Sequence, residues 1–220
     1  MPSLPPARLA IVFDIFLPAF ITLFVTVDPV SIIPIFVSLT LGASRSHKIR
    51  MALLGCLIAT ALLLMFGLIG QRLLDNFGIT MPAFRVAGGV LLFLISLEML
   101  FSRRNERKSK SAEEIHGHYE PEDISVFPLA IPLLCGPGAI ASIMLLTADQ
   151  EGNLAGQAVV LGAGALVMLI GAVLLVMAAR FDHFIPQTVS NIITRLLGML
   201  LAALSVQFIF DGLKAGFLGG

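Results

Sequence analysis

Long hydrophobic stretches with almost no charge constrain this chain more than any other feature of its sequence. A helix needs about 20 mostly apolar residues to cross the roughly 30 Å hydrocarbon layer of a bilayer. Three stretches meet that requirement, and a fourth begins with a proline in its first turn, where no backbone donor is lost. The four stretches are 51–70, 82–101, 155–179 and 192–210. The sequence therefore predicts an integral membrane protein.

The composition also favours lipid as the surrounding solvent. The chain is 57% hydrophobic and 13% charged, with a mean hydropathy of +0.97. Its 14 basic and 14 acidic residues could not cover the surface of a water-soluble domain of this length. The net charge is zero and the one basic cluster, 103–110, is typical of a loop beside a membrane, so we expect no nucleic-acid partner.

Two further hydrophobic stretches contain signals that break a helix. A straight helix over 10–41 would run about 48 Å, which exceeds the hydrocarbon thickness. Within it, Asp28 is a preferred N-cap residue and Pro29 suits the first position of a new helix. The stretch 124–148 repeats the pattern at Gly136-Pro137-Gly138. We therefore expect two discontinuous spans and six spans in total.

The two breaks lie in corresponding positions of an internal repeat. Residues 28–32 align with 136–140 at an offset of 108, and the Arg-x-x-Gly sequence beginning at Arg85 aligns with that at Arg195 at an offset of 110. Each half then holds three spans, and an odd number places the second half upside down. We expect an all-α membrane protein of six transmembrane segments, arranged as two inverted three-span repeats with discontinuous first and fourth spans. The halves are 1–101 and 124–220, joined by a polar cytoplasmic linker over 102–123.

Lysine and arginine give the orientation, because they gather on the cytoplasmic side of membrane proteins. Nine basic residues lie on the side of the loops after spans one, three and five, against three on the other side. The nine are Arg45, Lys48, Arg50, Arg103, Arg104, Arg107, Lys108, Lys110 and Arg180, and the three are Arg8, Arg72 and Lys214. We expect a multi-pass protein of the inner (cell) membrane with both termini outside the cytoplasm. The N-terminus lacks the features of a removable signal peptide, so we expect it to be retained.

Two motifs resemble those of the MarC family of membrane proteins. One runs over 28–36, from Asp28-Pro29 to Ile35-Phe36, and the other over 128–140, where Pro-Leu-Ala-Ile-Pro leads into Gly-Pro-Gly-Ala. The resemblance covers essentially the whole chain. It implies a six-span fold related to the LysE-like exporters, with transport of small neutral amino acids in some archaeal members. Relatives often carry a glycine and an asparagine between the two prolines of the first motif, where this chain has Val30-Ser31-Ile32-Ile33, so any role of those residues is not transferred.

Paired helix breaks at membrane depth indicate a binding site, because unpaired backbone groups persist there only beside protein or water. The two new helices begin at Pro29 and Pro137. Asp28 brings a negative charge to the first, whereas Gly136 leaves backbone N–H groups open at the second. We expect a small zwitterion with its carboxylate at Gly136 to Gly138, its ammonium near Asp28, and Ser31 as a further polar contact. The alternative is that Asp28 only caps its helix and Gly-Pro-Gly only makes a turn.

These features favour a secondary membrane transporter of small solutes, with small neutral amino acids as the expected class. No Walker A motif is present, so coupling would come from a proton or a sodium ion, with Asp28 as the group that exchanges the proton. The alternatives are an exporter of other small metabolites or drugs, an intramembrane enzyme, and an assembly factor. Enzyme motifs such as GxSxG and HExxH are absent, so we expect no enzyme, no catalytic residue and no cofactor.

The remaining polar and small residues receive structural interpretations. Arg85 is expected to reach the interface or to pair, and Gln207 to form a hydrogen bond between helices. His116 and His118 belong to the linker, and no metal site is expected. Both cysteines are expected to be free thiols. Five glycines are expected to allow close helix packing, namely Gly88, Gly89, Gly162, Gly164 and Gly198.

Overall fold

The computed structural model describes residues 6–101, 124–181 and 187–218, and every regular element in these ranges is a helix. The elements are α1 (Pro6–Val27), α2 (Pro29–Leu39), α3 (Arg45–Asn76), α4 (Met81–Leu100), the π-helix η1 (Ser125–Leu134), α6 (Pro137–Ala148), α7 (Leu154–Arg180) and α8 (Gln187–Leu218). Within these ranges five helical stretches are long and apolar enough to cross a membrane, and the bent pair of η1 and α6 makes a sixth if it is one span. The expectation of an all-helical membrane protein is confirmed.

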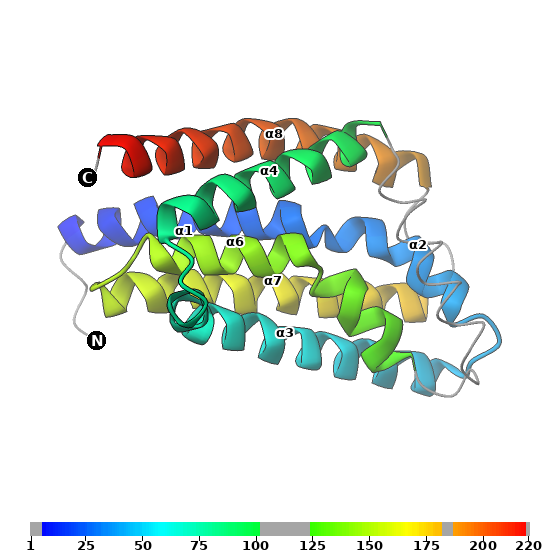
Figure 1. The fold of residues 1–220 in the computed structure, drawn as a ribbon. Helices are drawn as coiled ribbons and strands as arrows, with labels where there is room; N and C mark the ends of the chain where they lie inside the picture. Colours follow the sequence, from blue (N-terminus) through cyan, green and yellow to red (C-terminus); the bar gives the residue numbers. More distant parts are fainter. Residues whose placement is uncertain (1–5, 102–123, 182–186, 219–220) are drawn as a thin grey trace.

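The helices lie roughly along one direction and the chain passes back and forth between two ends of the bundle (Figure 1). We call the end where α1 begins and α8 ends the terminal end. The opposite end, where α4 ends and η1 begins, is the linker end. The predicted linker itself, 102–123, lies outside the described residues.

The expected apolar spans agree with the helices, with one consistent difference. The limits of α4 and α7 fall within one residue of the predicted stretches. Helices α3 and α8 each have 32 residues and extend beyond the predicted stretches at both ends. The difference arises because polar and charged residues can continue a helix past the hydrocarbon, where hydropathy no longer detects it.

Helix interruptions occur before Pro29 and Pro137, but they differ in shape, and the discontinuous spans expected there stay a prediction. Asp28 separates α1 from α2 with φ at +53°, in the left-handed region, and 13–39 still counts as one apolar stretch of 27 residues. In the second half, Phe127 and Ile131 have extended backbones, as residues before prolines prefer. The chain then passes Cys135 and Gly136, and α6 leaves η1 at an angle of 59°.

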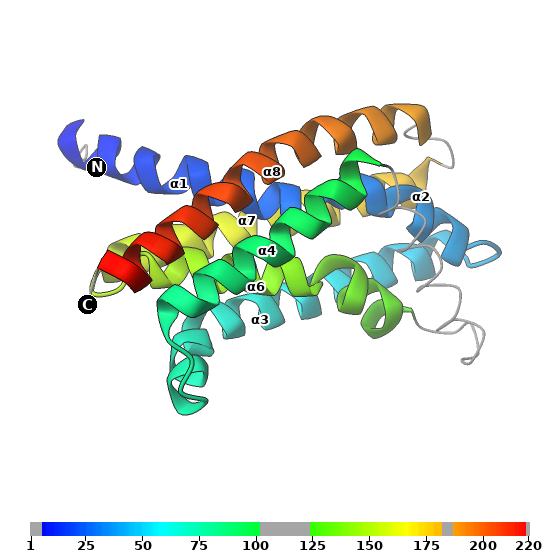
Figure 2. The same cartoon turned by 45° about the horizontal axis from the view of Figure 1, so that its top comes forward.

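The buried side chains form two clusters. The larger one joins α1, α2, α3, η1, α6 and α7. The smaller one lies where α4 and α8 meet the rest of the bundle, and it consists of Val25, Leu92, Ile95, Met99, Leu145 and Leu201. Helices α4 and α8 lie side by side in both views and make the most extensive contact between any two elements of the described chain (Figure 2).

Candidate functional site

Asp28 occupies the break between α1 and α2 and is completely buried. Its backbone N–H donates to the carbonyl oxygen of Phe24 at 2.9 Å, which closes the last turn of α1. Its side chain makes no capping hydrogen bond to α2. The usual N-cap hydrogen bond is therefore not formed by the Asp28 side chain. This weakens the alternative that Asp28 only caps α2.

Ser31 lies in the first turn of α2, three residues after Asp28, and is also completely buried. Its Oγ lies 2.6 Å from Oγ1 of Thr194 in α8, and this hydrogen bond joins the first broken segment to the last helix. Thr194 is itself buried. Sequence reasoning missed Thr194, because a single threonine inside an apolar helix more often bonds its own backbone.

Both breaks contact the same part of α7. A Cβ atom placed on Gly171 would lie 3.5 Å from Cβ of Pro29 and 3.9 Å from Cδ2 of Leu134. Pro29 begins α2, and Leu134 ends η1 just before the second break. Pro29, the first residue of α2, and Leu134, the last residue of η1, therefore both lie beside Gly171 of α7.

The Gly136-Pro137-Gly138 segment is packed unevenly. Gly136 is half-buried, Pro137 is exposed and Gly138 is buried. A Cβ atom on Gly138 would lie 2.5 Å from Cδ1 of Ile95, so a side chain of α4 fills the space at that residue. The zwitterion site stays a prediction. Within it, Gly138 packs closely against the Ile95 side chain of α4, and Gly136 is the more accessible of the two glycines.

Two buried hydroxyl groups find no hydrogen-bond partner among the described residues. They belong to Ser142 of α6 and Ser190 of α8, and both residues are completely buried. Most buried hydroxyl groups in membrane helices bond a carbonyl of the preceding turn, as Thr26 does here with Thr22. Buried hydroxyls that do not do so are unusual and need an explanation.

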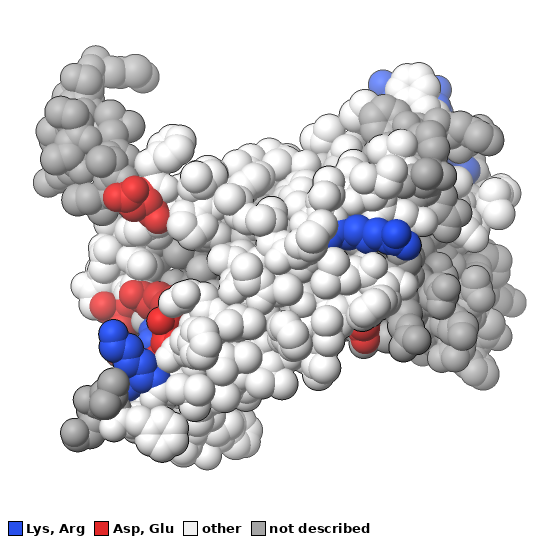
Figure 3. Space-filling view, turned by 90° about the horizontal axis from the view of Figure 1, so that it is seen from above, with Lys and Arg blue, Asp and Glu red and all other residues white. Residues whose placement is uncertain are grey.

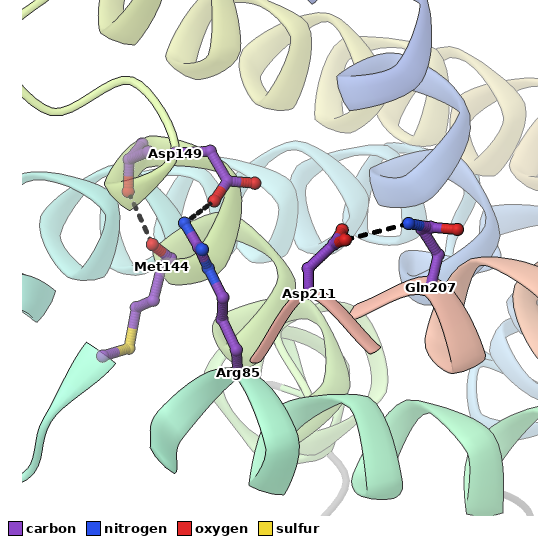
Figure 4. A network of polar contacts seen from close by, with 6 residues as sticks. Arg85, Met144, Asp149, Gln207 and Asp211 are labelled. Carbon is purple, nitrogen blue, oxygen red and sulfur yellow. Dashed lines mark hydrogen bonds and ion pairs between the residues drawn. The ribbon is translucent and has the colours of Figure 1, made fainter. Parts of the chain in front are cut away.

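A second polar cluster lies at the terminal end (Figure 4). Arg85 of α4 forms an ion pair with Asp149, which follows α6, and Gln207 donates to Asp211 at 2.9 Å within α8. Burial raises the pKa of Asp149, the Arg85 guanidinium lowers it, and the nearby Asp211 carboxylate raises it. The expected pairing of Arg85 is observed, whereas Gln207 bonds along its own helix and not between helices.

The other sequence interpretations can be placed as well. Cys56 and Cys135 are free, buried thiols. In the described ranges no group of three or more histidine, cysteine or acidic side chains is placed to hold a metal ion. His116 and His118 lie outside those ranges.

Comparisons with known proteins agree with the motifs. The model of the MarC family of integral membrane proteins matches residues 13–217. A UPF0056 membrane protein of Methanocaldococcus jannaschii is 36% identical over 206 residues, which cover 92% of this chain and 88% of that protein. One from Aquifex aeolicus is 37% identical, covering 91% and 92%, and the Escherichia coli UPF0056 membrane protein YhcE is 35% identical, covering 94% and 95%. No solved structure matches the chain. The chain belongs to the MarC family of integral membrane proteins.

Proposed function

We propose that this protein is a secondary transporter of small neutral amino acids, built from two inverted three-span halves with the solute site at the helix breaks. The observation that carries the proposal is the completely buried Asp28 at an interruption of an apolar stretch. Ionisable residues inside membrane segments are energetically expensive and usually mark a path for ions or substrates. Interrupted helices in corresponding positions of two halves are the usual setting of such a site.

Reciprocal contacts between α4 and α8 support the inverted arrangement. A Cβ atom on Gly89 would lie 2.9 Å from the carbonyl oxygen of Ser205, and one on Gly198 would lie 3.2 Å from that of Ser96. Gly198 follows Gly89 by 109 residues and Ser205 follows Ser96 by 109 residues, one residue fewer than the offset of 110 at which the two Arg-x-x-Gly sequences align. The two serine hydroxyls also repeat one bond, to the carbonyl three residues earlier, at 2.6 and 2.7 Å. A two-fold axis between the helices would generate this reciprocity.

The two half-helices after the breaks support it too. Helix α2 runs from Asp28 toward the linker end, whereas α6 runs from Gly136 toward the terminal end (Figure 1). Thr40 and Thr147 close these half-helices with the same bond, from the hydroxyl to the carbonyl four residues earlier, at 2.8 Å in both. Opposed half-helices with matching ends are expected of inverted repeats.

The charges at the two ends support an orientation with the linker end in the cytoplasm. Charged side chains in Figure 3 lie toward the ends, with a largely uncharged band between them. Among side chains that the structure describes, the linker end has Arg45, Lys48, Arg50, Arg180 and Arg195 against Glu98. The terminal end has Arg72, Arg85 and Lys214 against Asp14, Asp75, Asp149, Glu151 and Asp211. By the positive-inside rule both termini face outward across the inner membrane.

The chemistry of the breaks suits a zwitterion of small size. The Asp28 carboxylate can attract an ammonium group and can exchange a proton or hold a sodium ion for coupling. The N-terminus of α6 presents backbone N–H groups and a partial positive charge to a carboxylate beside Gly136. Ile95 fills the space at Gly138, which limits the solute to a short side chain.

Uptake into proteoliposomes tests the proposal directly. We expect the purified protein to take up labelled glycine and alanine faster than leucine, in response to a proton or sodium gradient. Asp28→Asn should abolish the coupling while preserving the fold, because asparagine tolerates the left-handed backbone at this position. Asp14→Asn is the control, since Asp14 lies in α1, the helix that ends just before Asp28, but is exposed.

The same experiment separates the alternatives. Uptake of other metabolites or drugs, without uptake of amino acids, would support an exporter of those solutes. If the protein moves none of them under any gradient, the transporter proposal is wrong. If Asp28→Asn transports at the parental rate with the parental ion dependence, the assignment of Asp28 is wrong.

A further inference from the structure

Two buried hydroxyl groups meet at the interface between α2 and α8, and a third lies one helical turn away on α8. Ser31 and Thr194 bond each other across it at 2.6 Å. Ser190 precedes Thr194 by four residues, so the two side chains lie on the same face of α8, about one helical turn apart. The Ser190 hydroxyl is completely buried without a hydrogen-bond partner in the described part of the chain.

These oxygens follow one another from the linker end toward the helix break. Ser190 lies in the first turn of α8, which begins at the linker end. Thr194 lies one turn deeper, where it meets Ser31. Asp28 is a further three residues back along the chain from Ser31, at the N-terminus of α2. Along α8 and then α2, a buried polar group therefore occurs at about each helical turn between the linker end and Asp28.

Packing alone does not require these hydroxyls. The corresponding interface of the other half, between α6 and α4, has apolar residues at two of the three places, whereas Arg85 corresponds to Thr194. Ala139 corresponds to Ser31 and Met81 corresponds to Ser190, at offsets of 108 and 109. Next to Ala139, Ile95 closes tightly on Gly138. At Ser31 and Ser190 the first interface thus carries a hydroxyl where the second has an apolar side chain, although an unpaired buried hydroxyl such as that of Ser190 is unfavourable compared with a methyl group.

We propose that the α2–α8 interface, lined by Ser31, Ser190 and Thr194, is the route by which water and the amino-acid solute pass between the linker end and the break at Asp28. The inference rests on the proposed function and names the elements through which the site opens. In the present structure Ser31 and Thr194 bond each other, so α2 and α8 are in contact at this point of the route. When the helices separate, each hydroxyl can donate to a carboxylate and accept from an ammonium group or from water.

Cysteine accessibility tests the route without any solute. Ser190→Cys and Thr194→Cys are made in protein carrying Cys56→Ala and Cys135→Ala, then exposed to the anionic reagent sulfonatoethyl methanethiosulfonate from the linker side. Ser205→Cys is the matched control, since Ser205 is equally buried on the same helix but bonds its own backbone. Leu196→Cys, on the exposed face of α8, controls for reaction through lipid. We expect residues 190 and 194 to react at least tenfold faster than both controls.

Uptake measurements then tie the route to transport. Thr194→Val and Ser190→Ala should each lower the rate of glycine uptake by roughly three- to tenfold, the usual effect of losing one hydrogen bond. Thr194→Ser restores a hydroxyl and should retain the parental rate, as should Ser205→Ala. These conservative variants separate loss of the route from loss of the fold.

The outcomes distinguish this inference from the proposed function. If cysteines at 190 and 194 react no faster than those at 196 and 205, the route is wrong, even if the parent protein transports glycine. If Thr194→Val and Ser190→Ala both transport at the parental rate, the route is also wrong. If the two cysteines react rapidly but the parent moves no amino acid, the hydrated route stands and the proposed function fails.

Discussion

The close packing of α4 against α8 leads to a quantitative prediction about two glycines. We consider Gly89→Ala and Gly198→Ala, which add one methyl group at each of the reciprocal contacts. The new Cβ would lie 2.7 Å from Cγ1 of Ile209 in the first variant, besides its contact with the Ser205 carbonyl oxygen. In the second it would lie 2.8 Å from Cβ of Met99, besides its contact with the Ser96 carbonyl oxygen. Backbone atoms cannot move aside as a flexible side chain can, so the helices must separate.

The expected magnitude follows from two opposing terms. Overpacking of this kind typically costs about 1–3 kcal/mol. Replacing glycine by alanine inside a helix returns about 1 kcal/mol. We therefore expect each variant to lose about 1 kcal/mol of stability, which is roughly 2–4 °C in melting temperature for a chain of this size.

Gly162→Ala is the matched control, because a Cβ at Gly162 in the first half of α7 has nothing within 4 Å. Alanine at this position favours the helix without any overpacking, so the melting temperature of this variant should rise by roughly 2–4 °C. The expectation that Gly162 allows close helix packing is wrong, because no atom of another helix in the described chain lies near the place of its missing side chain.

Thermal unfolding in detergent can be followed with a dye that reacts with thiols, since Cys56 and Cys135 are buried and become reactive on unfolding. If Gly89→Ala and Gly198→Ala both stabilise the protein as Gly162→Ala does, the close contacts do not exist in solution. If one is destabilising and the other is not, the reciprocity that supports the inverted repeat fails.

Three further predictions concern the break, the terminal end and the topology. Asp28→Ala should be less stable than Asp28→Gly by about 1–2 kcal/mol, because alanine disfavours the left-handed backbone, and equal melting temperatures would contradict the geometry of the break. The pKa of Asp149 is raised by burial despite Arg85, so its contribution to stability is largest below its ordinary pKa and is lost as pH rises through the folded value. Arg85→Gln should enlarge this fall in melting temperature and extend it to higher pH, and Asp149→Asn should remove it. Identical pH profiles in all three proteins would refute the pairing. A reporter fused at Gly220 should read as outside and one inserted at Ser111 as inside, and a cytoplasmic C-terminus would overturn the inverted repeat.

The sequence predicted those features that depend on local physical rules. The apolar stretches followed from hydrocarbon thickness, and the helix starts at Pro29 and Pro137 followed from the preference for proline in the first turn of a helix. The ion pair of Arg85, which is formed with Asp149, followed from the energetic cost of an unpaired charge near the membrane.

The features that sequence reasoning missed depend on contacts between distant elements. Gly138 looked open from its neighbours in the chain, yet Ile95 of α4 fills the space beside it. Thr194 and Ser190 carry no spacing signal, since a hydroxyl in a helix can equally bond its own backbone. Gln207 donates its hydrogen bond to Asp211, four residues along its own helix, and not to a residue of another helix.

The unequal distribution of charge along the helices has a consequence for the surrounding lipid. In α3, 21 uncharged residues separate Arg50 from Arg72, or about 31 Å of helix. Only 12 separate Arg85 from Glu98 in α4, or about 18 Å, and 15 separate Arg195 from Asp211 in α8, or about 22 Å. Hydrophobic mismatch therefore falls on the α4–α8 side, where the uncharged band of Figure 3 lies. On that side the bilayer must thin locally or the arginine side chains must extend to the headgroups. The protein should therefore be more stable in bilayers of short-chain lipids, which are thinner.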